Sequence, residues 1–266
     1  MTPRMAGLMI AVATGLPACA WAQDAEELAK KLANPIAALI SVPLQFNYDK
    51  DIGAANGHKS FINVQPVIPF SLNRDWNIIS RTILPVVIEQ KDIAGKSGSQ
   101  SGIGDIVQSL FFSPKAPTSG GLIWGVGPVF LLPTASESLL GGEKWGLGPT
   151  GVMLTQRGPW TVGALANHIW SVGGDSSRAD ISATFVQPFL SYTTKSATSF
   201  ALNTESTYDW KGETWSVPIN MTVSQMLKFG KQSVQIGAGV RYWADSPANG
   251  PHGWGARVQV TFLFPK

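Results

Sequence analysis

The sequence predicts an all-β protein: a transmembrane antiparallel β-barrel of about 12 strands with a short N-terminal helix. Three observations carry this prediction. Charged residues make up only 14% of the chain, whereas an ordinary soluble domain has about 25%. Apolar and polar residues alternate with a period of two after residue 36, and most tryptophans lie near the ends of the predicted strands.

The first 22 residues have the layout of a cleaved secretory signal peptide. Arg4 lies in a short head, an apolar run follows, and an Ala-x-Ala site ends at Ala22. A lipoprotein signal is the alternative, because Leu16–Cys19 partly resembles a lipobox, although proline fits poorly there. Cleavage after Ala22 removes the only cysteine, so we expect no disulfide and no cysteine-ligated metal. After residue 22 no run of 18 apolar residues could form a transmembrane helix.

Residues 23–35 are expected to form a helix that lies in the periplasm or plugs the barrel. Asp24 can serve as its N-cap, and Asn34-Pro35 ends it. Two Glu–Lys pairs have i,i+4 spacing, and three apolar residues share one face. The pairs are Glu26 with Lys30 and Glu27 with Lys31, and the apolar residues are Ala25, Leu28 and Leu32.

Residues 36–266 form the predicted barrel. Val42, Leu44 and Phe46 alternate with polar residues such as Gln45 and Asn47, which is typical of a strand with one apolar and one polar face. Each hairpin signal in such a barrel is weak, so the sequence does not exclude a barrel of ten or fourteen strands. The predicted strands are 36–50, 59–72, 75–89, 103–114, 120–134, 144–157, 159–173, 179–193, 198–211, 213–226, 231–246 and 252–265.

Loop lengths and tryptophans favour a membrane barrel over a soluble β-sandwich. Short connections tend to alternate with longer ones, as in outer-membrane barrels, although the short "KGE" after residue 210 breaks this pattern. A sandwich would more often place tryptophan in its core, whereas aromatic girdles of a barrel lie at the membrane interfaces. The tryptophans near predicted strand ends are Trp76, Trp145, Trp160, Trp170, Trp210, Trp215, Trp243 and Trp254.

Two near-copies of Trp-Gly-x-Gly-Pro raise the question of a phosphate-binding loop. "WGVGPVFLLPT" begins at Trp124 and "WGLGPTGVMLT" begins at Trp145. Neither has the third glycine or the following helix of a dinucleotide-binding motif. We interpret these glycines as inner-face positions of strands, and Gly125, Gly127, Gly237 and Gly239 indicate space inside the barrel.

Segments spread along the chain, among them "GIGDIVQSLFFSP", "WGVGPVFLLPT" and "WTVGALANHIWS", carry a family resemblance. They resemble the outer-membrane family named for the MetA pathway of phenol degradation. Many of its members carry the name transporter or, misleadingly, neuromedin U. The resemblance covers nearly the whole chain after the signal peptide and implies an outer-membrane β-barrel that passes small hydrophobic or aromatic compounds. One departure from outer-membrane proteins in general is the C-terminus, where Phe264 is followed by Pro265-Lys266 instead of ending the chain. The matching segments include "NPIAALISVPLQFNYD", "GIGDIVQSLFFSP", "WGVGPVFLLPT", "EKWGLGPTGVML", "WTVGALANHIWS", "WSVPINMTVSQM" and "VTFLFPK".

The sequence gives little support for an enzyme. His58 and His252 fall in predicted loops, and no histidine has the neighbours of a metal site. The stretch "NHIWS" resembles the Ser-His-Asn set of outer-membrane phospholipases, but a spacing of three places His168 and Ser171 on opposite faces of a strand. A serine of another strand beside His168 would revive this alternative. We therefore expect no catalytic residues, no metal and no cofactor.

Charged and polar residues on predicted inner faces are the candidate site. They form either a constriction that selects solutes or a set of ion pairs that holds the barrel shape. The candidate lumen-facing residues are Asp49, Arg81, Asp105, Asn203, Glu205, Asp209, Arg241 and Arg257.

The predicted function is a channel or transporter for small molecules in the outer membrane of a Gram-negative bacterium. A closed structural or adhesion barrel and a barrel-borne lipid hydrolase are the alternatives. Expected partners are outer-membrane lipids and lipopolysaccharide, the barrel-assembly machinery and a small-molecule solute. With 20 basic and 17 acidic residues and no basic cluster, the chain lacks the charge pattern of a nucleic-acid-binding protein.

Overall fold

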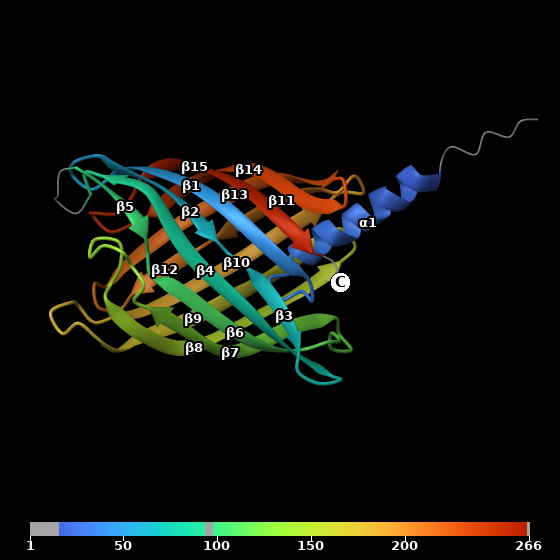
Figure 1. Cartoon of the computed structure of the whole chain (residues 1–266), viewed down its shortest axis with the longest axis horizontal. Coiled ribbons are helices and arrows are strands. Elements are labelled where there is room, and N and C mark those ends of the chain that lie inside the picture. The colour runs from blue at the N-terminus through green and yellow to red at the C-terminus, as the bar shows by residue number, and fades with distance from the viewer. Residues whose placement is uncertain (1–15, 94–97, 265–266) are drawn as a thin grey trace, which may run out of the picture.

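The chain folds into one closed antiparallel barrel with a helix at one end (Figure 1). The computed structural model describes residues 16–93 and 98–264, with side chains from residue 23 onward. Most of the predicted signal peptide, residues 1–15, lies outside the described residues. In the described part of the chain, no helix is long and apolar enough to cross a membrane.

Fifteen strand segments form the twelve strands of the barrel, because three strands are interrupted. The interruptions fall at Gln65-Pro66, Gly104-Asp105 and Glu205. Each strand pairs antiparallel with its neighbours, and pairing of the first strand with the last closes the sheet. The segments are β1 Ile40–Ile52, β2 Gly57–Val64, β3 Val67–Ser71, β4 Trp76–Lys91, β5 Ser99–Ile103, β6 Ile106–Pro114, β7 Leu122–Leu132, β8 Lys144–Arg157, β9 Trp160–Gly174, β10 Ser182–Thr193, β11 Thr198–Thr204, β12 Ser206–Asp209, β13 Thr214–Phe229, β14 Gln232–Asp245 and β15 Gly253–Phe264.

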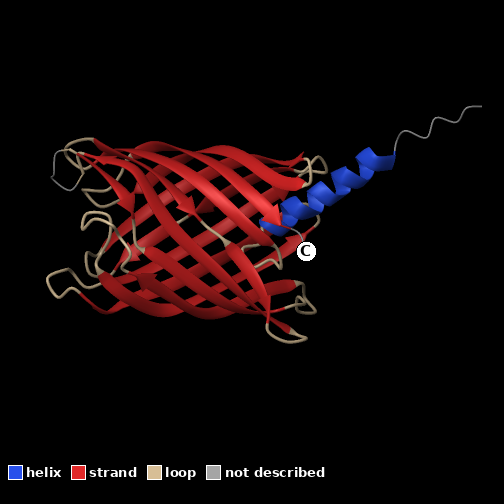
Figure 2. Ribbon diagram, in the orientation of Figure 1, coloured by secondary structure: helices blue, strands red, loops and turns tan. Residues whose placement is uncertain are grey.

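The predicted strand count is confirmed, and the even number places both ends of the barrel sheet at the same end of the barrel (Figure 2). We call this end, where the helix also lies, the α1 end, and the opposite end the loop end. The turn 158–159 at the α1 end has two residues, whereas 133–143 at the loop end is a long loop. The short connection 210–213 at the loop end is the predicted exception.

Side chains alternate between the two faces of the wall, with a few irregularities where the pairing register shifts. In β8, Gly146, Gly148 and Thr150 point inward, while Leu147 and Met153 point outward and are exposed. Exposed large apolar residues lie on the outer face of most strands, and contiguous apolar surface of this kind marks a contact with lipid or protein. Such a surface is stable when it contacts lipid.

Aromatic residues gather on the outer face near both ends of the barrel. At the α1 end the rings of Trp76 and Trp124 meet edge to face, with centroids 5.8 Å apart. At the loop end Tyr208 packs against Trp210, with centroids 4.8 Å apart. Trp243 lies near the end of β14, as predicted, but it points inward and donates from its indole N–H to Asp49, so it is not part of the outer girdle.

Helix α1 (Leu16–Leu32) begins earlier than predicted and runs through the predicted cleavage position. Asp24 therefore lies inside the helix of the uncleaved chain instead of capping it. Both predicted ion pairs are present, at 2.6 Å each. The apolar face packs against the rim of the barrel, where Ala25 and Ala29 are buried with Ala197 and Met226.

Candidate functional site: the lumen and its cavity

A layer of charged side chains crosses the interior of the barrel. Arg257, only 2% exposed, donates to both carboxylate oxygens of Glu205, at 3.0 and 2.8 Å. Arg241 lies 3.5 Å from Asp49 and 3.9 Å from Glu205. Both arginines also donate to the amide oxygen of Asn47, at 2.8 Å from Arg257 and 3.4 Å from Arg241. The layer is therefore a hydrogen-bonded network. Charged side chains in a poorly solvated interior are stable only when they are paired and hydrogen-bonded in this way.

The structure brings Asp49, Glu205, Arg241 and Arg257 together in this layer. Asn203 also points inward and accepts a hydrogen bond from Asn220 at 2.9 Å.

Two of the eight predicted residues, Asp105 and Asp209, lie at the loop end, outside the charged layer. Asp105 lies at the break between β5 and β6 and accepts hydrogen bonds from the N–H groups of Ala135 and Gly142, at 3.1 and 2.6 Å. It therefore anchors the loop 133–143. Asp209 is exposed at the end of β12 and accepts from the N–H of Lys211 at 2.9 Å. By strand register Asp209 is on the inward face, since it is two residues after Thr207, which pairs with the inward Phe185.

Arg81 makes no ion pair within 4 Å in the described part of the chain, although Glu205 of the charged layer is near enough to interact with it electrostatically. It points inward from β4, and its Nη2 donates to Oε1 of Gln65 at 3.2 Å. A chain of amides continues from there, with Gln65 donating to Gln45 at 3.2 Å and Gln45 to Gln259 at 3.4 Å. Gln259 ends the chain by donating to the hydroxyl of Thr261 at 3.1 Å. Arg81 is thus the cationic end of a row of hydrogen-bonded polar side chains on the inner wall, which we call the polar track and which continues through Gln65, Gln45 and Gln259 to Thr261.

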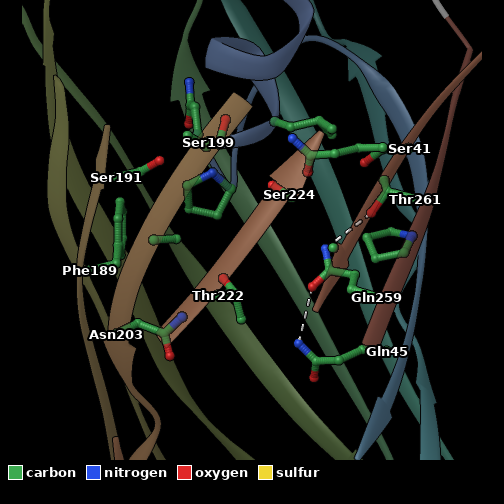
Figure 3. Close-up of a pocket in the computed structure, with 18 of the residues that line it drawn as sticks. Ser41, Gln45, Phe189, Ser191, Ser199, Asn203, Thr222, Ser224, Gln259 and Thr261 are labelled. Atoms are coloured by element: carbon green, nitrogen blue, oxygen red, sulfur yellow. Dashed lines mark hydrogen bonds between the residues drawn. The ribbon is translucent and has the colours of Figure 1, made fainter. Parts of the chain in front are cut away.

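A cavity of about 240 Å³ lies between the charged layer and α1 (Figure 3). Arg81, Glu205 and Arg257 border it on the side of the charged layer, and Leu32, Ala37 and Leu39 border it on the side of α1. Figure 3 shows Gln45 and Gln259 on one side of the cavity and Phe189 on the other. The cavity therefore has a charged end, a polar wall and an apolar end.

The end of α1 and the segment after it together span the mouth of the barrel from one wall to the other. At one wall Ala29 packs with Met226 and Leu263. At the opposite wall Ile36, only 4% exposed, packs with a cluster that includes Phe111 and Leu165. A Cβ at Gly125 would stand 3.3 Å from Cδ1 of Ile36. This inner-face glycine thus provides the space that Ile36 fills.

Several important inward residues were not among the candidates. Asn47, Gln45 and Lys59 line the wall, and Trp243 donates from its indole N–H to Asp49 at 3.0 Å. The sequence could have indicated Asn47 and Gln45 as inward residues, because both alternate with apolar, outward residues of β1. Trp243 could have been found from its spacing of two from Arg241.

The histidines show one arrangement that the spacing did not predict. His168 points outward from β9, and its ring packs on Trp170 with centroids 4.1 Å apart. Its Nδ1 lies 2.7 Å from the hydroxyl of Thr184, and its Nε2 lies 3.4 Å from the hydroxyl of Ser182 on β10. The serine of another strand that the hydrolase alternative required is therefore present. Ser171 instead contacts Asp180.

The other two histidines lie near the loop end. His58, at the start of β2, contacts Glu89 at 3.3 Å, and His252 contacts Ser246 at 3.3 Å. Within the described ranges, no group of three or more His, Cys, Asp or Glu residues could hold a metal ion.

Comparison with known proteins supports the fold. No protein-family model matches the sequence, and no curated protein matches it. The crystal structure of the COG4313 outer membrane channel from Pseudomonas putida F1 is similar with a TM-score of 0.65 at 16% identity, over 85% of this chain and 96% of that one. Outer membrane phospholipase A from Escherichia coli is similar with a TM-score of 0.50 at 10% identity, over 85% of this chain and 90% of that one. The chain therefore has the fold of outer-membrane barrels.

Proposed function

We propose that this protein is a channel for small molecules in the outer membrane of a Gram-negative bacterium, and that residues 23–39 close one end of it. The observation that carries the proposal is the cavity between the charged layer and α1, bounded by a segment that reaches both walls. A barrel that served only as a scaffold would have no need of such a cavity. The resemblance to the family named for the MetA pathway of phenol degradation supports hydrophobic or aromatic compounds as cargo.

The mechanism that follows is passive passage without a covalent step. A solute enters from the loop end, passes the charged layer and reaches the cavity. Release requires α1 and the following segment to leave the mouth, because Ile36 and Ala29 are buried against opposite walls. In this account the cleaved signal peptide, the assembly machinery and contacts with lipid and lipopolysaccharide serve the delivery and placement of the barrel.

The experiment is single-channel recording of the refolded protein in planar bilayers. We compare residues 23–266 with residues 40–266, which begin at the start of β1. The proposal predicts low or intermittent conductance for the longer protein and steady conductance for the shorter one. Silence in both forms, with correctly folded barrels, would exclude the channel and favour a closed structural barrel.

A second candidate function rests on the contact between Ser182 and His168. A hydrolase would use the Ser182 hydroxyl to attack the carbonyl carbon of a lipid ester, with its proton passing to Nε2 of His168 and then to the leaving alcohol. Water would then release the acyl group. Thr184 can hold the ring by accepting from Nδ1–H, and Trp210 also donates to this hydroxyl at 2.8 Å.

A fluorophosphonate probe tests this second function, since it labels activated serines. The hydrolase predicts labelling that is lost in both Ser182→Ala and His168→Asn and kept in His58→Asn. Absence of label on folded protein in lipid vesicles, together with intact vesicle phospholipids, would exclude it.

A further inference from the structure

Arg81, which is half-buried, differs in its partners from the buried Arg241 and Arg257. Arg257 and Arg241 each have a carboxylate within 4 Å. Among the described residues, Arg81 has no such partner, and its one hydrogen bond goes to the neutral amide of Gln65. A guanidinium has five N–H donors, so most of those on Arg81 are left for water or a ligand. Arg81 also borders the cavity.

The charges around the cavity favour an anion. Three basic side chains, Lys31, Arg81 and Arg257, border the cavity together with the acidic Glu205. Lys31 pairs with Glu27 and Arg257 pairs with Glu205. Among the described charged residues that border the cavity, this leaves Arg81 as the basic one without a carboxylate within 4 Å. A carboxylate at Arg81 would complete the compensation of charge, and the planar guanidinium can bind it with two parallel hydrogen bonds.

The remainder of the cavity favours an apolar body on that anion. Val67 and Phe189 contribute apolar surface beside the polar track, and Leu32, Ala37 and Leu39 form the end near α1. The cavity has a volume of about 240 Å³. An apolar cavity of about 150 Å³ accommodates benzene, so the space is sufficient for one ring with a carboxylate.

We propose that the lumen cavity binds a small organic carboxylate with an apolar body, and that Arg81 receives the carboxylate. This inference rests on the proposed channel function, since it names the class of solute that the lumen accepts. The amides of Gln65 and Gln45 fix the orientation of the guanidinium and line the path of the ligand. Glu205 and Asp49 keep the other arginines occupied, so that the anion is directed to Arg81.

The test is calorimetric titration of the detergent-solubilised protein, residues 23–266, with benzoate and with its neutral analogue benzyl alcohol. We expect benzoate to bind at least tenfold more tightly than benzyl alcohol. Arg81→Gln should remove this preference, and Arg81→Lys should keep part of it, because lysine retains the charge without the planar fork. Arg157→Gln is the matched control, since Arg157 is exposed at the α1 end of β8, and it should bind benzoate as the parent does.

A second variant protects the test against misfolding of Arg81→Gln. Gln65→Glu keeps the shape of the side chain and places a carboxylate on the hydrogen-bonding partner of Arg81, 3.2 Å away in the parent. It should weaken benzoate binding at least tenfold while the barrel keeps its folded mobility on gels. Unchanged benzoate binding in either folded variant, or equal binding of benzoate and benzyl alcohol to the parent, would overturn the proposal.

Calorimetry does not depend on conduction, so the two proposals can fail separately. If benzoate binds through Arg81 but the protein never conducts, the binding site is supported and the channel function is refuted. If the protein conducts but shows no preference for benzoate, the channel function is supported and the binding site is refuted.

Discussion

Replacement of Ile36 by alanine tests how the N-terminal segment closes the barrel. Ile36 is 4% exposed and packs with Ile79, Phe111 and Leu165 on the inner wall. Truncation of a buried isoleucine to alanine costs about 2–5 kcal/mol. Ile36 precedes β1 and belongs to no strand of the wall, so we assign the loss to docking of the segment and not to folding of the barrel.

The size of the effect follows from that value. If docking loses about 3 kcal/mol, the ratio of open to closed channels rises by about 100-fold, since every 1.4 kcal/mol changes an equilibrium tenfold. Single-channel recording measures this ratio directly as the time spent in each conductance level. Ile36→Ala should therefore spend far more time open than the parent protein.

Two further variants complete this experiment. Ile88→Ala removes the same atoms from a residue that is 48% exposed, and it should leave the open fraction unchanged. Gly125→Val fills the space that Ile36 occupies and should open the channel as Ile36→Ala does. An open fraction in Ile36→Ala equal to that of Ile88→Ala would refute the account of closure.

Three other predictions concern the barrel itself. Glu205→Gln leaves Arg257 without its anion, so we expect a loss of about 3–5 kcal/mol in urea unfolding; an unchanged midpoint would show that the pair is not structural. Met153→Arg places a charge on the lipid-facing side of β8 and should cost about 2–4 kcal/mol near the middle of a bilayer, and no loss in lipid would contradict the outward orientation. The hydrogen bond from Lys144, at 3.1 Å, holds the pKa of the Asp180 carboxyl below its usual value. This contact stabilises the loop at neutral pH and is lost as the pH falls through that lowered pKa, so carboxyl NMR of Lys144→Gln should show a higher pKa for Asp180, and an unmoved titration would contradict it.

The strands were predictable because their pattern is local. Lipid on one side and a polar lumen on the other impose a period of two, and residues such as Phe46 and Asn47 show it directly in the sequence. The three interruptions were not predicted. At Gln65-Pro66 the pairing with β4 keeps its register, since Val64 pairs with Leu84 and Val67 pairs with Arg81, and Pro66 has no N–H to donate to the ladder. At Gly104-Asp105 the register against β4 shifts, and this shift follows only from how β5 and β6 lie beside β4.

The site was predictable only in part, for a related reason. Inward direction follows from alternation, so Arg81, Arg241 and Arg257 could be chosen from the sequence. Their partners could not, because Asn47 lies about two hundred residues away from Arg241 along the chain. Ile36 is a further case, since its burial depends on a segment folding back across a completed barrel.

The measurement that tests the central claim most directly is the rate at which a thiol inside the cavity reacts from the α1 end. Residues 23–266 contain no cysteine, so Ser224→Cys, on the cavity wall, provides a single reporter in protein inserted into vesicles. A charged methanethiosulfonate added at the α1 end should react slowly with residues 23–266 and many times faster with residues 40–266. Equal rates in the two proteins would contradict a lumen that the N-terminal segment closes.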